Sequence, residues 1–261
     1  MAWEYVTIER TPPLALVRFD RKANLNAFNQ QLIDELTEAA LSFHNDIDVH
    51  YVVLSGTDTV FSAGADMKGG LFREPEADSD PDRKDIKARR SFQSGGRLCK
   101  AWEEMPQITI AAMERMSVGG GAALALACDW RVLGRTAFLY VPEVKIGLNL
   151  QWGTLPRLIT LVGPARAKRI TLMCEKMDAA TALDWGLIDE IADDGKTVEV
   201  AQAMARKVAE MPPATVRLMK EAINATANAL HRATSFADAD QSQLTGTFAA
   251  AKAAREAFMK K

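Results

Sequence analysis

Two short segments rich in glycine and alanine constrain this chain more than any other feature. Residues 61–68 (FSAGADMK) follow the strand-like run 51–54, and residues 117–129 (SVGGGAALALACD) follow the strand-like run 108–112. Small side chains let another group approach the main chain, and the alanine–leucine run after the glycines predicts a helix. A helix start leaves N–H groups unpaired and carries partial positive charge. Two such segments facing one oxygen atom would form an oxyanion hole from backbone alone.

Length and composition predict an ordinary globular α/β protein. The 261 residues suffice for one α/β domain, with or without a helical appendage, and 48% of them are hydrophobic. A net charge of -2 argues against a nucleic-acid partner. The chain has no basic leader and no long uncharged apolar run, so we expect neither a secretory signal nor a membrane partner. The widely spaced Cys99, Cys128 and Cys174 favour a reducing cytoplasm, with Cys128 as a buried small hydrophobe.

Strand-like and helical segments alternate up to about residue 140, which predicts crossover units and a mainly parallel sheet. Residues 3–19 read as two strands around a turn at 11–13, and residues 30–44 have helical spacing. After Gly163 the pattern is helical nearly to the end. The clearest helical segments there are 198–210, 214–229 and 248–260.

A charged stretch at residues 69–90 interrupts this alternation. Pro75 and Pro81 are expected to break any helix in its first half. Residues 74–82 therefore predict a solvated, mobile loop, which would also suit a lid on the substrate side of the first glycine–alanine segment.

Six sequence boxes, in order, resemble the crotonase superfamily, also called the enoyl-CoA hydratase/isomerase family, and together they span nearly the whole chain. They are residues 21–28 (RKANLNAF), 61–68, 119–129, 142–148 (PEVKIGL), 163–167 (GPARA) and 179–188. The first box departs from the family pattern, because Lys22 stands where the family usually has proline. The resemblance implies a ββα spiral core at residues 1–195. It also implies a C-terminal helical trimerisation region at 196–261, with homotrimers often paired into hexamers.

The resemblance also implies how the chemistry would be divided among residues. The amides of Ala65 and Gly120 match the family's oxyanion hole, and Glu143 matches its acid/base glutamate. Hydratases of the family carry another glutamate at the position of Ala123, and two carboxylates activate water better than one. A single glutamate can still move a proton from C2 to C4. We therefore expect an enoyl-CoA double-bond isomerase that binds an acyl-CoA thioester.

The remaining substrate contacts follow from the same resemblance. Ala63, Ala65 and Met67 would hold the CoA moiety through main-chain contacts, and Lys22 would pair with a phosphate. Gln151, which replaces an aspartate of related dienoyl isomerases and dehalogenases, could hydrogen-bond substrate or water. Lysines near the C-terminus could add positive charge: Lys252, Lys260 and Lys261. No cofactor is expected beyond the coenzyme A of the substrate, and no metal.

Two alternatives stay open. The first is a one-glutamate hydratase or hydratase-lyase for aromatic enoyl-CoA, with Trp152, Phe72 and Phe92 lining the acyl pocket. The second is a CoA- or RNA-binding homologue with little catalysis. Several other polar residues are expected to serve structure. We expect Asp66 to cap a helix and the three histidines to lie at the surface: His44, His50 and His231.

Overall fold

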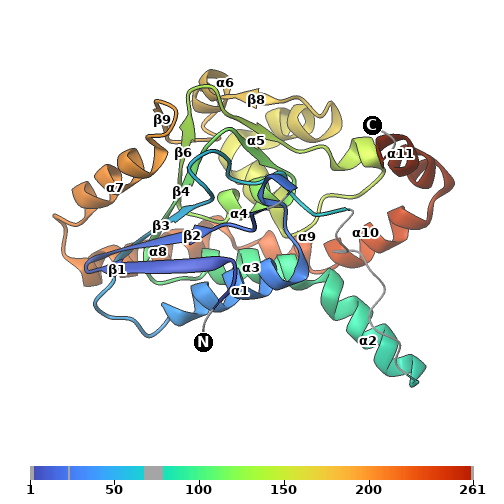
Figure 1. Ribbon diagram of the computed structural model, residues 1–261, viewed down its shortest axis with the longest axis horizontal. Coiled ribbons are helices and arrows are strands. Elements are labelled where there is room, and N and C mark those ends of the chain that lie inside the picture. The colour runs from blue at the N-terminus through green and yellow to red at the C-terminus, as the bar shows by residue number, and fades with distance from the viewer. Residues whose placement is uncertain (1–2, 23, 68–78, 260–261) are drawn as a thin grey trace.

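The computed structural model describes residues 3–22, 24–67 and 79–259, and its centre is a six-stranded sheet (Figure 1). The strand order is β1–β2–β3–β4–β6–β9, and only the β1–β2 pair is antiparallel. The strands are β1 (Val6–Thr11), β2 (Leu14–Phe19), β3 (Tyr51–Ser55), β4 (Ile108–Met113), β6 (Trp130–Gly134) and β9 (Glu190–Ala192). The expected strand pair near the N-terminus and the mainly parallel sheet are confirmed.

A second, three-stranded sheet has the order β5–β7–β8. Its strands are β5 (Met116–Val118), β7 (Phe138–Tyr140) and β8 (Met177–Asp178). The chain passes repeatedly from the large sheet to the small one, from β4 to β5 and from β6 to β7, before a helix follows. This repeated passage winds the chain into a spiral.

Both faces of the large sheet are buried, as is usual for parallel strands. Val52 and Leu54 of β3 pack toward α1 (Gln30–Ser42) and α3 (Ser94–Glu103). The alternate residues Tyr51 and Val53 belong to a second apolar cluster with α7 (Thr197–Val208). Successive side chains of a strand point to opposite faces, so one short run serves two cores.

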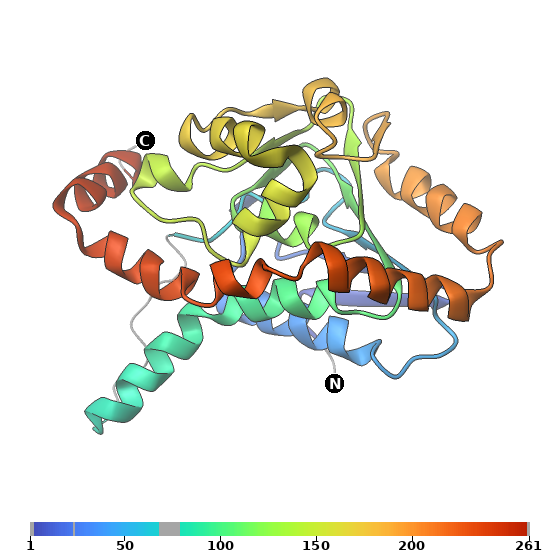
Figure 2. The same ribbon diagram turned by 180° about the vertical axis from the view of Figure 1, so that it is seen from behind.

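Helices and short helical turns make up most of the remaining described chain, and α8 runs beside α3 (Figure 2). The Asn224 amide of α8 donates to the Glu103 carbonyl of α3 at 3.3 Å. The bounds are η1 (Asn24–Asn26), α4 (Gly120–Leu126), η2 (Glu143–Ile146), α5 (Thr154–Leu172), α6 (Ala179–Asp184), α8 (Pro213–Ala227), α9 (His231–Ser235), α10 (Asp238–Thr247) and α11 (Ala249–Met259). Within the described ranges, none of these helices combines the length and the apolar character that crossing a membrane requires.

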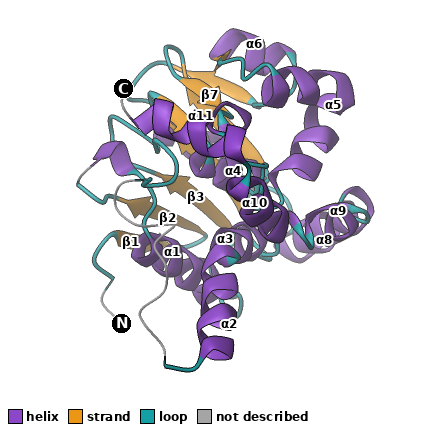
Figure 3. Cartoon of the chain, turned by 90° about the vertical axis from the view of Figure 1, so that its right-hand side faces the viewer, coloured by secondary structure: helices purple, strands orange, loops and turns teal. Residues whose placement is uncertain are grey.

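The charged stretch differs from its prediction. Helix α2 (Pro81–Phe92) occupies its second part and projects from the rest of the chain (Figure 3). Pro81 opens this helix instead of breaking it, because a first-turn proline needs no N–H partner. Asp80 caps the helix by accepting from the Asp82 and Arg83 amides. Residues 79 and 80 of the expected loop form an exposed bend, as predicted, and residues 74–78 lie outside the described residues.

The region after Gly163 also contains two short strands that the sequence pattern did not predict. β8 and β9 are only two and three residues long, too short to show a period. Helix α7 packs against β4 and β6 of the large sheet, beyond the proposed boundary at residue 195. The division at that residue stays a prediction.

Candidate active site

The two glycine–alanine segments lie side by side. The Ser62 N–H donates to the Met116 carbonyl at 3.0 Å, and the Val118 N–H donates to the Ser62 carbonyl at 3.0 Å. Gly64 has a φ of 90°, and a Cβ there would lie 2.6 Å from the Val118 oxygen and 3.6 Å from the Gly120 nitrogen. Only glycine combines this conformation with such a close approach, so Gly64 brings the two segments together.

Each segment presents one amide. The Phe28 N–H donates to the Gly64 carbonyl, and the Phe28 carbonyl accepts from Asp66, which fixes the backbone of Ala65. Gly120 begins α4, where an N–H has no acceptor within the helix. Within the described part of the chain, neither the Ala65 N–H nor the Gly120 N–H makes a hydrogen bond. Both can therefore donate to an oxygen of a bound molecule.

The N-terminal box anchors the first segment. Arg21 forms an ion pair with the buried carboxylate of Asp66, and Asn24 donates to the same carboxylate at 3.2 Å. The Asn26 amide donates to the Phe61 carbonyl at 2.9 Å. Asp66 therefore fastens the first box to the second. The helix that it was expected to cap would begin beyond residue 67, outside the described residues.

Glu143 opens η2 and places its carboxylate against the glycines. A Cβ on Gly119 would lie 2.8 Å from Oε1 of Glu143, and Gly119 has a φ of 50°. Oε2 is shielded from solvent and has no hydrogen-bond partner among the described residues. Burial raises the pKa of Glu143 to about 7. A carboxyl group with such a pKa can both take up and release a proton near neutrality.

One cavity of about 110 Å³ brings most of the sequence candidates together. Eight of them line it: Ala63, Ala65, Met67, Gly120, Ala123, Glu143, Gln151 and Trp152. Lys22 is exposed and does not line this cavity. Phe258 of α11 also lines it, which sequence reasoning missed because no local pattern links α11 to η2.

An adjoining cavity of about 640 Å³ shares Met67 and Leu148 with the first. Phe92 and Lys252 line it, so two further sequence candidates lie next to the Glu143 cavity. Phe72, Lys260 and Lys261 lie outside the described residues. The roles of all these residues in binding stay predictions.

Gln151 and Trp152 follow η2 in a loop that α10 and α5 hold. The Gln151 Nε2 donates to Ser242 of α10 at 3.3 Å, while its Oε1 is buried without a partner among the described residues. Arg157 of α5 donates to the Trp152 carbonyl at 2.8 Å. Sequence reasoning missed Ser242 and Arg157, because both act across the fold on a distant loop.

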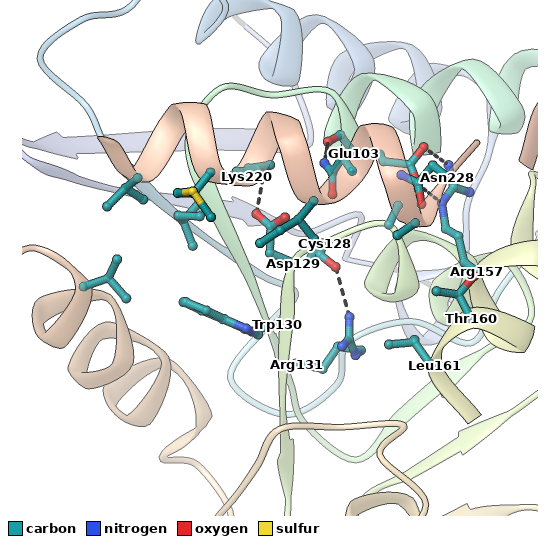
Figure 4. Close-up of a pocket in the computed structure, with 18 of the residues that line it drawn as sticks. Glu103, Cys128, Asp129, Trp130, Arg131, Arg157, Thr160, Leu161, Lys220 and Asn228 are labelled. Atoms are coloured by element: carbon teal, nitrogen blue, oxygen red, sulfur yellow. Dashed lines mark hydrogen bonds and ion pairs between the residues drawn. The ribbon is translucent and has the colours of Figure 1, made fainter. Parts of the chain in front are cut away.

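A separate cavity of about 560 Å³ lies under α8, and no described residue lines both it and the Glu143 cavity. Figure 4 shows that its charged side chains are paired: Lys220 contacts Asp129 at 2.7 Å, and Arg157 contacts Glu103 at 2.8 Å. Burial raises the pKa of Cys128 to about 12, as befits the packing role expected of it. No group of three or more potential metal ligands occurs in the described ranges.

The histidines differ in exposure. His44 is exposed, as expected, whereas His50 and His231 are partly buried. The His231 Nε2 lies 3.2 Å from the Thr160 hydroxyl, beside the Glu103–Arg157 pair. The surface prediction is wrong for His231, because α9 folds back onto α5.

Comparison with known proteins agrees with this geometry. A family model described as enoyl-CoA hydratase/isomerase matches residues 9–261. The probable enoyl-CoA hydratase echA8 of Mycobacterium bovis is 30% identical over 227 residues, which cover 86% of this chain and 82% of that protein. The short-chain-enoyl-CoA hydratase of Clostridium acetobutylicum is 29% identical and covers 84% of this chain and 80% of its own length. The solved structure of Pseudomonas aeruginosa OdaA has a TM-score of 0.85 at 27% identity, covering 99% of this chain and 100% of that one.

The chain therefore belongs to the enoyl-CoA hydratase/isomerase family, within the crotonase superfamily, and its α/β fold is the crotonase fold. Family membership makes it an enzyme of the hydratase/isomerase type.

Proposed function

We propose that this protein is an enoyl-CoA hydratase, which adds water to the double bond of a 2-enoyl thioester. The observation that carries the proposal is a pair of buried acceptor atoms, Glu143 Oε2 and Gln151 Oε1, to which no described residue donates a hydrogen bond. Both residues line the cavity onto which the two free amides open. The relatives' names also favour hydration over the isomerisation that Ala123 suggested in the sequence.

The two amides would stabilise the reacting thioester. Its carbonyl oxygen would accept from the N–H groups of Ala65 and Gly120. Negative charge grows on that oxygen as the enolate forms, and one fixed donor is typically worth ~3 kcal/mol of transition-state stabilisation. Coenzyme A enters as part of the substrate, and the proposal requires no other cofactor.

The two acceptors would orient the attacking water. A water molecule that donates one hydrogen to Glu143 and the other to Gln151 turns a lone pair toward C3. As the oxygen bonds to C3, Glu143 takes the released proton, and the electrons of the double bond move into the enolate. Glu143 then returns the proton to C2, so the net change is addition of one water. A pKa of about 7 suits both transfers.

Isomerisation of 3-enoyl-CoA is the second candidate. It is favoured by Ala123, whose buried methyl side chain stands where the family's hydratases have a carboxylate. Glu143 alone would then carry a proton from C2 to C4. The aromatic hydratase-lyase and the weakly catalytic binding protein are further alternatives.

A paired assay tests the proposal. We expect crotonyl-CoA hydration to be faster than 3-enoyl-CoA isomerisation, and Glu143→Gln to lower both by roughly two to four orders of magnitude. Gln151→Ala should lower hydration at least tenfold while sparing isomerisation. Efficient isomerisation without hydration would instead make the protein an isomerase. No turnover, together with CoA-dependent thermal stabilisation, would leave only a binding role.

The proposal includes a cytoplasmic homotrimer, or two such trimers paired. Its support is a set of large apolar side chains that α8 and the residues on either side of α9 leave exposed. They are Leu218, Met219, Ile223, Leu230 and Phe236. Burying such a surface between subunits would remove it from water. Light scattering on the purified protein should give three or six times the mass of one chain, and a monomer would contradict this.

A further inference from the structure

The indole of Trp152 is wedged between two glycines from different helices. A Cβ on Gly95 of α3 would lie 1.8 Å from its Cε2, and a Cβ on Gly120 of α4 would lie 2.6 Å from its Cη2. The indole also meets the Phe28 ring edge-on, with 5.9 Å between ring centroids. Only 7% of Trp152 is exposed. No larger residue than glycine would let the indole occupy this position.

This indole stands between two cavities of very different size. The catalytic cavity measures about 110 Å³, and a neighbouring cavity on the α3–α9 side measures about 780 Å³. Among the residues that the structure describes, their linings overlap at only two positions, Gln151 and Trp152. Trp152 is therefore part of the wall that separates them.

The loop that carries Trp152 is held by hydrogen bonds to its backbone. Arg157 donates to the Trp152 carbonyl at 2.8 Å, and Glu103 holds the Arg157 guanidinium through two bonds of 2.8 and 2.9 Å. The next amide, of Gly153, donates to the Asp238 carboxylate at 2.8 Å. Arg157, Glu103 and Asp238 belong to three different helices, so moving the loop would break hydrogen bonds to groups that the rest of the fold holds in place.

From this geometry we infer that Trp152 limits the length of the acyl chain, which makes the preferred substrate a short-chain 2-enoyl-CoA. The inference rests on the proposed function. On this measure one water needs about 10–15 Å³, so a cavity of about 110 Å³ holds roughly seven to eleven groups of that size. A four-carbon acyl group fits with its carbonyl oxygen, whereas a ten-carbon chain with its carbonyl oxygen and sulfur does not. Replacing the indole by a methyl group would join the two cavities and give a longer chain room to extend toward Phe92 and Gly96.

The test compares kcat/KM for 2-enoyl-CoA esters of four, six, eight and ten carbons. Wild type should prefer the four-carbon over the ten-carbon ester at least tenfold. Trp152→Ala should raise the ten-carbon to four-carbon ratio at least tenfold, and Trp152→Phe should give an intermediate ratio and serves if the alanine variant fails to fold. Trp185→Ala is the matched control, because that indole stacks on Arg166 and lines none of these cavities.

Equal use of all chain lengths by wild type would overturn the inference, as would an unchanged ratio in both Trp152 variants. Such a result would direct the acyl chain to the cavity beyond Met67 and Leu148 instead. Calorimetric binding of saturated butyryl-CoA and decanoyl-CoA separates this failure from failure of the proposed function. Those esters undergo no hydration, so the same length preference and the same shift in Trp152→Ala should appear even without turnover.

Discussion

Two largely buried carboxylates, those of Asp129 and Glu143, show how much a side chain's surroundings decide its chemistry. Asp129 accepts from Lys220 and from both the amide and the hydroxyl of Thr109. Glu143 lies against Gly119 with one oxygen unpartnered among the described residues. A buried carboxylate without a cation is unfavourable when ionised, which is why its pKa rises. Such an arrangement weakens the fold locally and therefore indicates function.

Glu143 should make stability depend on pH. Its pKa in the folded protein, about 7, exceeds the ordinary 4.5, so the stability it contributes is present below pH 4.5 and is lost as pH rises through 7. That difference corresponds to about 3 kcal/mol at pH 8. We expect Glu143→Gln to melt roughly 5–10 °C above wild type at pH 8 and close to it at pH 5.

Thermal melts across this range measure the difference directly. Glu210→Gln, an exposed substitution, should track wild type at every pH. A Glu143→Gln variant that is less stable than wild type at pH 8 would mean that the carboxylate has a stabilising partner in solution.

At the scale of elements, the site depends on how the segment after β3 meets β5 and α4. Ser62 pairs with β5 as a short parallel extension, and Gly64 then turns the chain so that Ala65 faces Gly120. The strands are rigid and buried, so the two amides are held by the core instead of by the substrate. Such preorganisation is what makes oxyanion donors effective.

Gly64→Ala should damage both activity and stability. The new Cβ would meet the Val118 carbonyl at 2.6 Å, and backbone on both sides must move apart. We expect hydration to fall by about two to three orders of magnitude, because one oxyanion donor is displaced. Gly195→Ala is the control, since Gly195 also has a positive φ, 79°, but no atom within 4 Å. It should destabilise by about 1 kcal/mol with unchanged turnover; equal turnover in both variants would contradict this reading of Gly64.

At the scale of the whole molecule, polar contacts fasten the C-terminal helices to the core. Lys220 of α8 donates to the Asp129 carboxylate and to the Gln107 carbonyl, each at 2.7 Å. Asn224 reaches the Glu103 carbonyl one turn further along. The same helix leaves the apolar side chains of Leu218, Met219 and Ile223 exposed.

Lys220→Met should loosen this attachment. It leaves the Asp129 carboxylate buried without its cation, and removing one member of a buried ion pair typically destabilises by ~3–5 kcal/mol. Denaturant unfolding should show a loss of this order, and adding Asp129→Asn should recover part of it. Lys207→Met, an exposed change on α7, should alter little. A loss confined to the control, or none in either variant, would show that apolar packing alone holds α8.

The sequence by itself determined the local elements and the chemistry they could carry. Apolar runs gave β3 and β4 their place in a buried sheet, and the triple glycine before alanines and leucines set the start of α4. Glu143, Ala65 and Gly120 were named by the resemblance of their boxes to the family, because each box is a short contiguous segment. The prediction that Pro81 breaks a helix was wrong, because a proline that disrupts the interior of a helix is favoured at its first position.

Only the tertiary structure decided how these pieces act on one another. The pKa of Glu143 follows from burial beside Gly119, and the position of the Trp152 indole follows from the space that Gly95 and Gly120 leave. The Lys220–Asp129 pair joins residues 91 positions apart. Electrostatics and volume depend on which surfaces meet in space, whereas sequence patterns report only the preferences of neighbouring residues.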